Sequence, residues 1–188
     1  MTNNCGDSVR QAYPLFQEEG GGCRPTSPLQ FNIGEIGAIK ACQLNSIWHS
    51  RLPRIEVGNV VRNPYYICFA AEYGGEYYAV GIWSSPVALN RFNCKNILEL
   101  RRFAICPDAP KNTASRMLRI MIHKIRRKFP QIEQLISYQD SEVHKGTIYK
   151  ASGWIIKGIS KYREWDSQKR KRNDSQSTAD KVVWIKEV

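Results

Sequence analysis

Three side chains that can accept or donate a proton lie close to the predicted ends of regular elements. His49 follows a predicted helix, and it is one of only three histidines, so few side chains titrate near neutral pH. Asp140 ends the strand-like run QLISYQD, and ligands of open α/β sheets gather at such strand ends. Tyr149 lies in the predicted short helix GTIYKASG, and its phenol can donate a proton.

Each of these residues also has a structural interpretation, which stays open at this point. A histidine at a helix end can be capped by backbone, an aspartate after a strand commonly caps a turn, and a tyrosine in a short helix usually packs against a sheet. His144, beside Gly146, can likewise be a loop residue without a chemical role.

The segment DAPKNTASRML (residues 108–118) predicts an anion-binding loop. It connects the strand-like run ILELRRFAI to an amphipathic helix predicted over residues 114–128, so main-chain N–H groups and the positive helix end can face a phosphate-bearing ligand. The glycines usual in such loops are missing. Thr113 and Ser115 instead add hydroxyl donors, and Lys111 adds a positive charge.

The totals restrict the class of protein. A net charge of +11 favours a polyanionic partner, with nucleic acid first. Six scattered cysteines without a C-x-x-C pair indicate packed thiols rather than a disulfide framework or a metal site. No apolar run reaches the roughly 20 residues that span a bilayer, and no signal peptide is recognisable, so we expect a cytoplasmic protein without membrane contact.

The predicted elements follow the order β-α-β-β-β-α-β-α-β-β. One strand–helix–strand crossover in the middle predicts an α/β (α+β) fold, with a mixed, mostly antiparallel sheet of six or seven strands flanked by helices. Gly74 and Gly75 predict a hairpin turn, and Pro53 is expected to end the first helix. Residues 1–28 are expected to be an irregular arm, and residues 29–188 one domain with a basic loop at 166–180.

The order and spacing of these elements resemble the GNAT superfamily of acyl-CoA-dependent acyltransferases. Within it, three segments look like the Mom-type DNA-modification proteins of phages: NSIWHSRLP, ELRRFAICPDAPKNTASRML and SYQDSEVHKGTIYKASGW. The resemblance extends over roughly residues 35–160. It implies modification of the exocyclic amine of adenine in phage DNA, which protects the DNA from restriction, with a methylcarbamoyl (earlier described as acetamido) product and acetyl-CoA as donor.

The resemblance also implies roles for individual residues. Tyr149 would protonate the coenzyme A thiolate, and Asp140 or His49, which Ser50 follows, would handle the proton of the amine or, for His49, bind a metal. Direct acetyl transfer does not give the attributed product, so a metal or radical route stays open. The implied donor contacts are Phe103, Ala104, Ile105, Lys111, Asn112, Thr113, Ala114, Ser115 and Arg116.

Double-stranded DNA is the partner that the charge and the resemblance together favour. Phosphate contacts are expected from Arg51, Arg102 and the run Lys169, Arg170, Lys171 and Arg172, although Glu99 and Arg102, on alternating sides of one strand, can also be structural. Trp83, Tyr162 and Trp165 are candidates for stacking on a displaced base, with Trp83 also a core candidate. Two alternatives remain: an acyltransferase for a small amine, protein or tRNA, and a non-catalytic nucleic-acid-binding module.

Overall fold

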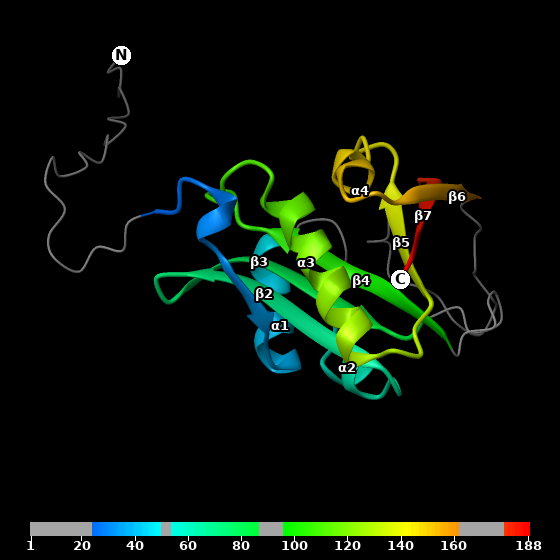
Figure 1. Ribbon diagram of the computed structural model, residues 1–188, viewed down its shortest axis with the longest axis horizontal. Coiled ribbons are helices and arrows are strands. Elements are labelled where there is room, and N and C mark those ends of the chain that lie inside the picture. The colour runs from blue at the N-terminus through cyan, green and yellow to red at the C-terminus, as the bar shows by residue number, and fades with distance from the viewer. Residues whose placement is uncertain (1–23, 50–53, 87–95, 162–178) are drawn as a thin grey trace, which may run out of the picture.

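The structure, a computed structural model, describes residues 24–49, 54–86, 96–161 and 179–188. Seven strands form one sheet in the order β1-β2-β3-β4-β5-β7-β6 (Figure 1). All neighbours are antiparallel except β4 and β5, which are parallel, so the predicted mixed and mostly antiparallel sheet is confirmed. The strands are β1 (Asn32–Glu35), β2 (Tyr66–Tyr73), β3 (Glu76–Ser84), β4 (Ile97–Ile105), β5 (Gln134–Asp140), β6 (Ile155–Ser160) and β7 (Lys181–Glu187).

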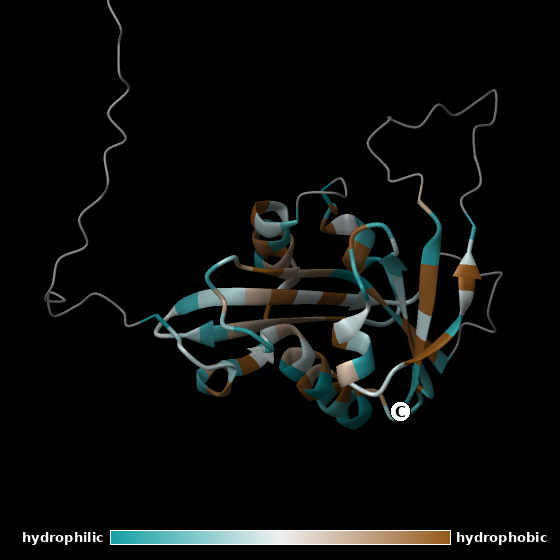
Figure 2. Ribbon diagram, turned by 90° about the horizontal axis from the view of Figure 1, so that it is seen from above, coloured by the Kyte–Doolittle hydropathy of each residue, from teal (hydrophilic) through white to brown (hydrophobic). Residues whose placement is uncertain are grey.

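Helices cover both faces of this sheet, as Figure 2 shows. On one face lies α3 (Thr113–Lys128), whose apolar stripe is buried against β2, β3 and β4, and α4 (Thr147–Ala151) packs beside it. The opposite face carries α1 (Ala38–Trp48) and the four-residue α2 (Gly58–Val61), which the sequence pattern did not predict. No helix in the described ranges has the length and apolarity needed to cross a bilayer.

Local turn chemistry agrees with the prediction in the hairpin and less well at the end of α1. Gly74 and Gly75 have φ angles of 60° and 83°, which the tight turn between β2 and β3 requires. The prediction that Pro53 ends the first helix is wrong, because α1 already ends at Trp48 and the His49 backbone is extended. A proline limits how far a helix continues, but it does not decide where the helix stops.

A β-bulge in β4 changes the direction of two charged side chains. Ile82 of β3 lies opposite Arg102 and Trp83 lies opposite Leu100, so Arg101 is the extra residue. Because of this insertion, Glu99 and Arg102 both face the α1 side of the sheet. The expectation that they lie on alternating sides is therefore wrong: a period of two holds only for a strand without a bulge.

The parallel pairing of β4 and β5 is short, and this positions the site. The strands pair only from Ile97 to Leu100 and from Gln134 to Ser137. The remaining residues of β4 continue beside β3, and those of β5 beside β7, so the two strands separate (Figure 1). The sheet therefore opens between its fourth and fifth strands.

Candidate active site

A cavity of about 780 Å³ lies where β4 and β5 separate. Its walls are residues 99–105 of β4, residues 137–140 of β5, the β5–α4 loop with the start of α4, and the end of α1. A volume of this size is within the roughly 300–1,000 Å³ range of small-molecule sites. Of the sequence-predicted residues, the cavity brings together His49, Arg102, Phe103, Ala104, Ile105, Ala114, Asp140 and Tyr149.

Tyr149 presents its hydroxyl to a buried serine at the base of this opening. The Tyr149 side chain is only 7% exposed, stacks on Trp184 with ring centroids 5.3 Å apart, and lies edge-on to Trp154. Its Oη lies 2.8 Å from Oγ of Ser137. Burial raises the pKa of the Tyr149 phenol and the Ser137 hydrogen bond lowers it by less, so the phenol keeps its proton at neutral pH. Tyr149 thus packs against two tryptophans and also carries a protonated hydroxyl group on the cavity wall.

His49 lines the cavity at the end of α1 and lies close enough to Arg102 and His144 to be affected by their charge. Burial lowers the pKa of the His49 imidazole, and the nearby Arg102 and His144 lower it further. The ring is therefore neutral at neutral pH and able to accept a proton. Arg102, three residues after the buried Glu99, donates to the carbonyl of Arg101 at 2.8 Å and lines the same cavity.

Asp140 lies on the cavity wall and also closes a turn. Its Oδ1 accepts a hydrogen bond from the N–H of Glu142 at 3.0 Å, as the structural interpretation of this residue expects. In the sheet it stands opposite Lys181 of β7, which also lines the cavity. The two interpretations of Asp140 are therefore compatible.

His144, which the sequence suggested could be a loop residue without a chemical role, also lines the cavity. It shares this cavity with His49, although 94 residues lie between the two in the chain. No local signal in the sequence links the two, because their approach depends on the β5–α4 loop folding back over the opening.

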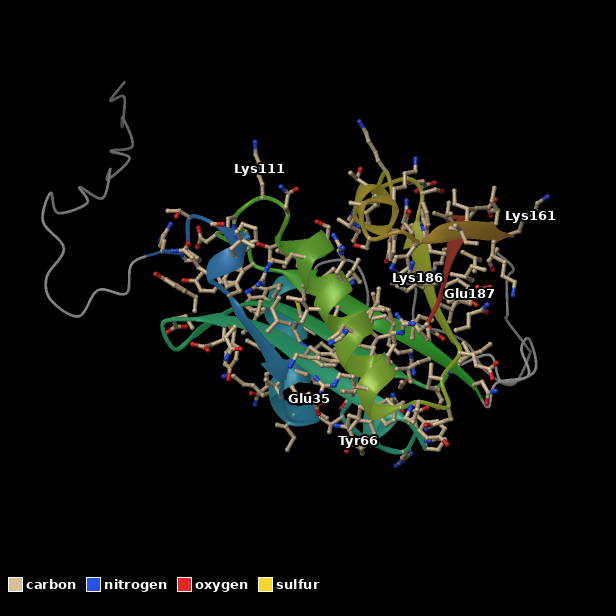
Figure 3. All side chains as sticks on the ribbon, viewed as in Figure 1. Glu35, Tyr66, Lys111, Lys161, Lys186 and Glu187 are labelled. Atoms are coloured by element: carbon tan, nitrogen blue, oxygen red, sulfur yellow. The ribbon has the colours of Figure 1, made fainter. Side chains whose placement is uncertain are left out.

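The segment from Lys111 to Ser115 forms its turn without a glycine. Asn112 adopts a left-handed conformation with φ of 67°, the only positive φ of a non-glycine residue among those described. Asparagine tolerates this region better than most residues, so it takes the role a glycine has in similar loops. The side chain of Lys111 projects from this loop away from the sheet (Figure 3).

The hydroxyl groups of this loop bond within the loop rather than face the cavity. Thr113 Oγ1 donates to the carbonyl of Pro110 at 2.7 Å, and Ser115 Oγ donates to the carbonyl of Asn112 at 3.1 Å. The expectation that they add donors for a ligand is wrong for this conformation. In the described part of the chain, the N–H groups of Ala114 and Ser115 have no protein acceptor, so the start of α3 still offers main-chain donors.

Several expected site residues lie away from the cavity or outside the described residues. Lys111, Asn112, Thr113, Ser115 and Arg116 do not line the cavity, and Arg116 donates to the carbonyl of Phe31 at 3.4 Å. The other expected residues, which lie outside the described residues, are Ser50, Arg51, Tyr162, Trp165, Lys169, Arg170, Lys171 and Arg172.

Trp83, Cys42 and Cys68 belong to the core. Trp83 is 0% exposed and its Nε1 donates to Met121 Sδ at 3.2 Å, so it is not accessible to a displaced base. Cys42 and Cys68 are buried free thiols, and burial raises the pKa of Cys68 to about 12. The described ranges contain no group of three or more His, Cys, Asp or Glu side chains suited to hold a metal ion.

Comparison with known proteins identifies both the fold and a family. The model of the Mom protein family matches residues 73–187, more than half of the chain. No curated protein matches the chain. Among solved structures, the ribosomal-protein-alanine N-acetyltransferase from Brucella melitensis is similar with a TM-score of 0.62 and 12% identity, over 84% of this chain and 99% of that one.

Two further similar structures were solved with a ligand. An acetyltransferase from Bacillus subtilis in complex with CoA has a TM-score of 0.57 and 15% identity, over 85% of this chain and 98% of that one. A GNAT family acetyltransferase from Elizabethkingia anophelis with acetyl-CoA bound has a TM-score of 0.56 and 14% identity, over 85% and 99%. At these identities the similarity establishes the GNAT fold, as the order of the elements predicted.

Proposed function

Because this chain belongs to the Mom protein family and has the GNAT fold, we propose that it uses an acyl-CoA donor to modify the exocyclic N6 amine of adenine in DNA. The modified DNA would be protected from restriction, and we expect the reaction to take place in the cytoplasm of a phage-infected bacterial host. The observation that carries the proposal is one cavity, between diverging strands, that holds a protonated phenol and a neutral imidazole.

The donor side of the proposal rests on the opening between β4 and β5. The main-chain N–H groups of Ala114 and Ser115, at the positive end of α3, suit the pyrophosphate of an acyl-CoA. Phe103, Ala104 and Ile105 of β4 line the cavity where its acyl arm would lie, and the left-handed Asn112 shapes the loop. Similar structures that were solved with CoA or acetyl-CoA bound support this choice of donor.

The chemistry follows from the protonation states. In an acyl transfer, the nitrogen of the exocyclic amine bonds to the thioester carbonyl carbon and the carbon–sulfur bond breaks. His49, neutral and lining the cavity, accepts the proton that the amine loses, and Tyr149 donates a proton to the departing sulfur. Asp140, on the same wall, can orient the amine by accepting its hydrogen bond. An aromatic amine is a weak nucleophile, so positioning must supply much of the acceleration.

The proposal that DNA supplies the acceptor amine rests on the net charge of the protein and on the position of Arg102. A protein with a net charge of +11 attracts DNA through its long-range field. A base must leave the duplex before its amine can reach the cavity, and enzymes that act on bases displace them in this way. Arg102, inside the cavity, is placed to bind a phosphate or the displaced base rather than the outer surface of the duplex.

The decisive experiment is mass spectrometry of nucleosides from bacteria that express the protein. The expected result is an adenosine adduct that is present with the wild-type chain and lost with Tyr149→Phe. The mass of the adduct identifies the transferred group: direct transfer from acetyl-CoA gives an acetyl adduct, whereas the methylcarbamoyl adduct that the family resemblance implies has a different mass and requires a further step. A normal set of nucleosides from cells with ample folded protein would argue for the small-amine, protein or tRNA acyltransferase. DNA binding without acetyl-CoA binding in calorimetry would favour the non-catalytic module.

A further inference from the structure

The loop between β5 and α4, residues 141–146, is attached at several points and carries a second imidazole into the cavity. The buried Gln139 uses both ends of its amide here: Oε1 accepts from Trp184 Nε1 at 2.6 Å, and Nε2 donates to the carbonyl of His144 itself. The N–H of His144 donates to the carbonyl of Asp140 at 3.2 Å. Both main-chain groups of His144 are thus fixed to β5.

The remaining attachments hold the two ends of this loop. Ser141 Oγ donates to the carbonyl of Asp180 at 3.1 Å, next to β7. Gly146 has φ of 71° and is so close to Trp184 and Gln139 that a Cβ atom would lie 2.5 Å and 2.6 Å from them. A loop held in this way has a defined position, which keeps the backbone of His144 at the cavity wall.

His49 and His144 differ in their exposure to solvent, and this difference sets the direction in which a proton would move between them. His49 is only partly exposed and lies among positive charges, so a proton that it accepts must leave before it can act again. His144 lines the same cavity but is exposed to solvent. An imidazole at the boundary between cavity and water can exchange a proton with the solvent.

Other charged groups line the cavity together with the two imidazoles. They are Glu99, Arg101 and Arg102 of β4, Asp140 of β5, Lys145 of the loop and Lys181 of β7. Tyr138 and Tyr149 also line the cavity, and burial keeps the Tyr149 phenol protonated. The cations outnumber the carboxylates, which agrees with the lowered pKa of His49, so a proton that His49 accepts is readily released.

We propose that His144 relays to solvent the proton that His49 takes from the acceptor amine. The inference rests on the proposed function for the identity of the proton, but not for the pairing of the imidazoles. The proton leaves the amine nitrogen as the new nitrogen–carbon bond forms, moves to His49, and passes across the cavity through His144 to water. The two histidines end the cycle neutral, and no oxidant or reductant is needed.

The pairing is tested on the free protein by NMR titration of its histidines. The chain has three histidines, so replacing each by glutamine assigns the signals. We expect His144→Gln to shift the titration of His49 to higher pH, because a positive neighbour is removed. His123→Gln, an exposed position on α3, is the matched control and should leave His49 unchanged. An unchanged His49 titration in His144→Gln would overturn the proposal whether or not the enzyme is active.

The relay itself is tested by chemical rescue. His144→Ala should slow DNA modification, and added imidazole should restore a large part of the rate, since a small base in the opening can replace the missing one. The same imidazole should not restore His49→Ala to a comparable extent, because that position is less exposed. A full wild-type rate in His144→Ala, or a loss that imidazole cannot restore, rules out the relay. A wild-type protein without modification activity would instead contradict the proposed function, while the NMR result would still decide the pairing.

Discussion

Oη of Tyr149 lies 2.8 Å from Oγ of Ser137, which is the last residue of β5 that pairs with β4. The hydrogen bond therefore lies at the point where the sheet opens. It joins the short helix α4 to the strand whose departure from β4 creates the cavity. The Tyr149 hydroxyl group is therefore fixed at the origin of the opening.

Replacing Tyr149 with phenylalanine is expected to reduce DNA modification by about 100-fold or more, because a general acid typically contributes that much. The aromatic stacking on Trp184 is retained, so stability should fall by only about 1 kcal/mol from the lost hydrogen bond. Nucleoside mass spectrometry and urea unfolding measure the two effects. Ser137→Ala, which leaves the phenol in place, is the control and should keep most of the activity. Wild-type activity in Tyr149→Phe would remove this residue from the mechanism.

The modification rate should depend on the protonation of His49. Burial and nearby cations lower its pKa, so the rate is expected to be constant through the neutral range and to fall only at a pH below the usual histidine value of about 6.5. The sign for stability is the same: the folded state favours the neutral ring, so this contribution is present above the unfolded pKa and is lost as pH falls through the folded pKa. A rate profile that rises with acidification would contradict the role of His49 as a base.

Gly146→Ala should destabilise the protein and displace His144. The added Cβ would lie 2.5 Å from Trp184, and the backbone has φ of 71°, so strain and overpacking act together at a cost of about 2–4 kcal/mol. Gly74→Ala is the matched control, since its φ is 60° but no atom lies within 4 Å of the new Cβ, and it should cost only about 1 kcal/mol. If urea unfolding gave the same loss of unfolding free energy for Gly146→Ala and Gly74→Ala, the contact of the new Cβ with Trp184 would not be the cause of the destabilisation.

The left-handed conformation of Asn112 predicts that two substitutions at this position have different effects on acetyl-CoA affinity. Asn112→Gly should preserve acetyl-CoA affinity, because glycine adopts φ of 67° without strain. Asn112→Val should weaken binding by about tenfold, since a β-branched residue in this region costs roughly 1–2 kcal/mol and the loop would change its shape. Isothermal titration calorimetry with acetyl-CoA measures both. Identical affinity in the two variants would place the donor elsewhere.

The basic run at residues 169–172 carries a prediction that rests on the sequence alone, because these residues lie outside the described part of the chain. Replacing Lys169, Arg170, Lys171 and Arg172 with glutamine should weaken DNA binding equally for all sequences. It should also flatten the plot of log affinity against log salt by about one unit for each phosphate contact removed. Fluorescence anisotropy over a range of salt concentrations is the measurement. An unaltered slope would show that other cations hold the duplex.

The sequence by itself determined the order of the strands and of α1, α3 and α4, because each of these elements depends on local patterns. The stripe from Met117 to Ile125 alternates with exposed cations at helical spacing, and it is buried as α3. Gly74 and Gly75 required their turn, and ILELRRFAI is β4 residue for residue. The order and spacing of the elements resembled the GNAT fold, and the resemblance in three short segments implied roles for His49, Asp140 and Tyr149, all of which line the cavity.

Only the tertiary structure decided how these residues meet. The bulge at Arg101 turns Glu99 and Arg102 to one face, and it arises from the register with β3, which no pattern within β4 reveals. The approach of His144 to His49 depends on Gln139 and Trp184, side chains from two strands that bond only after the sheet has assembled. Periodicity reports which face of an element is apolar. It does not report the contacts between elements that are distant in the chain, and those contacts formed the cavity.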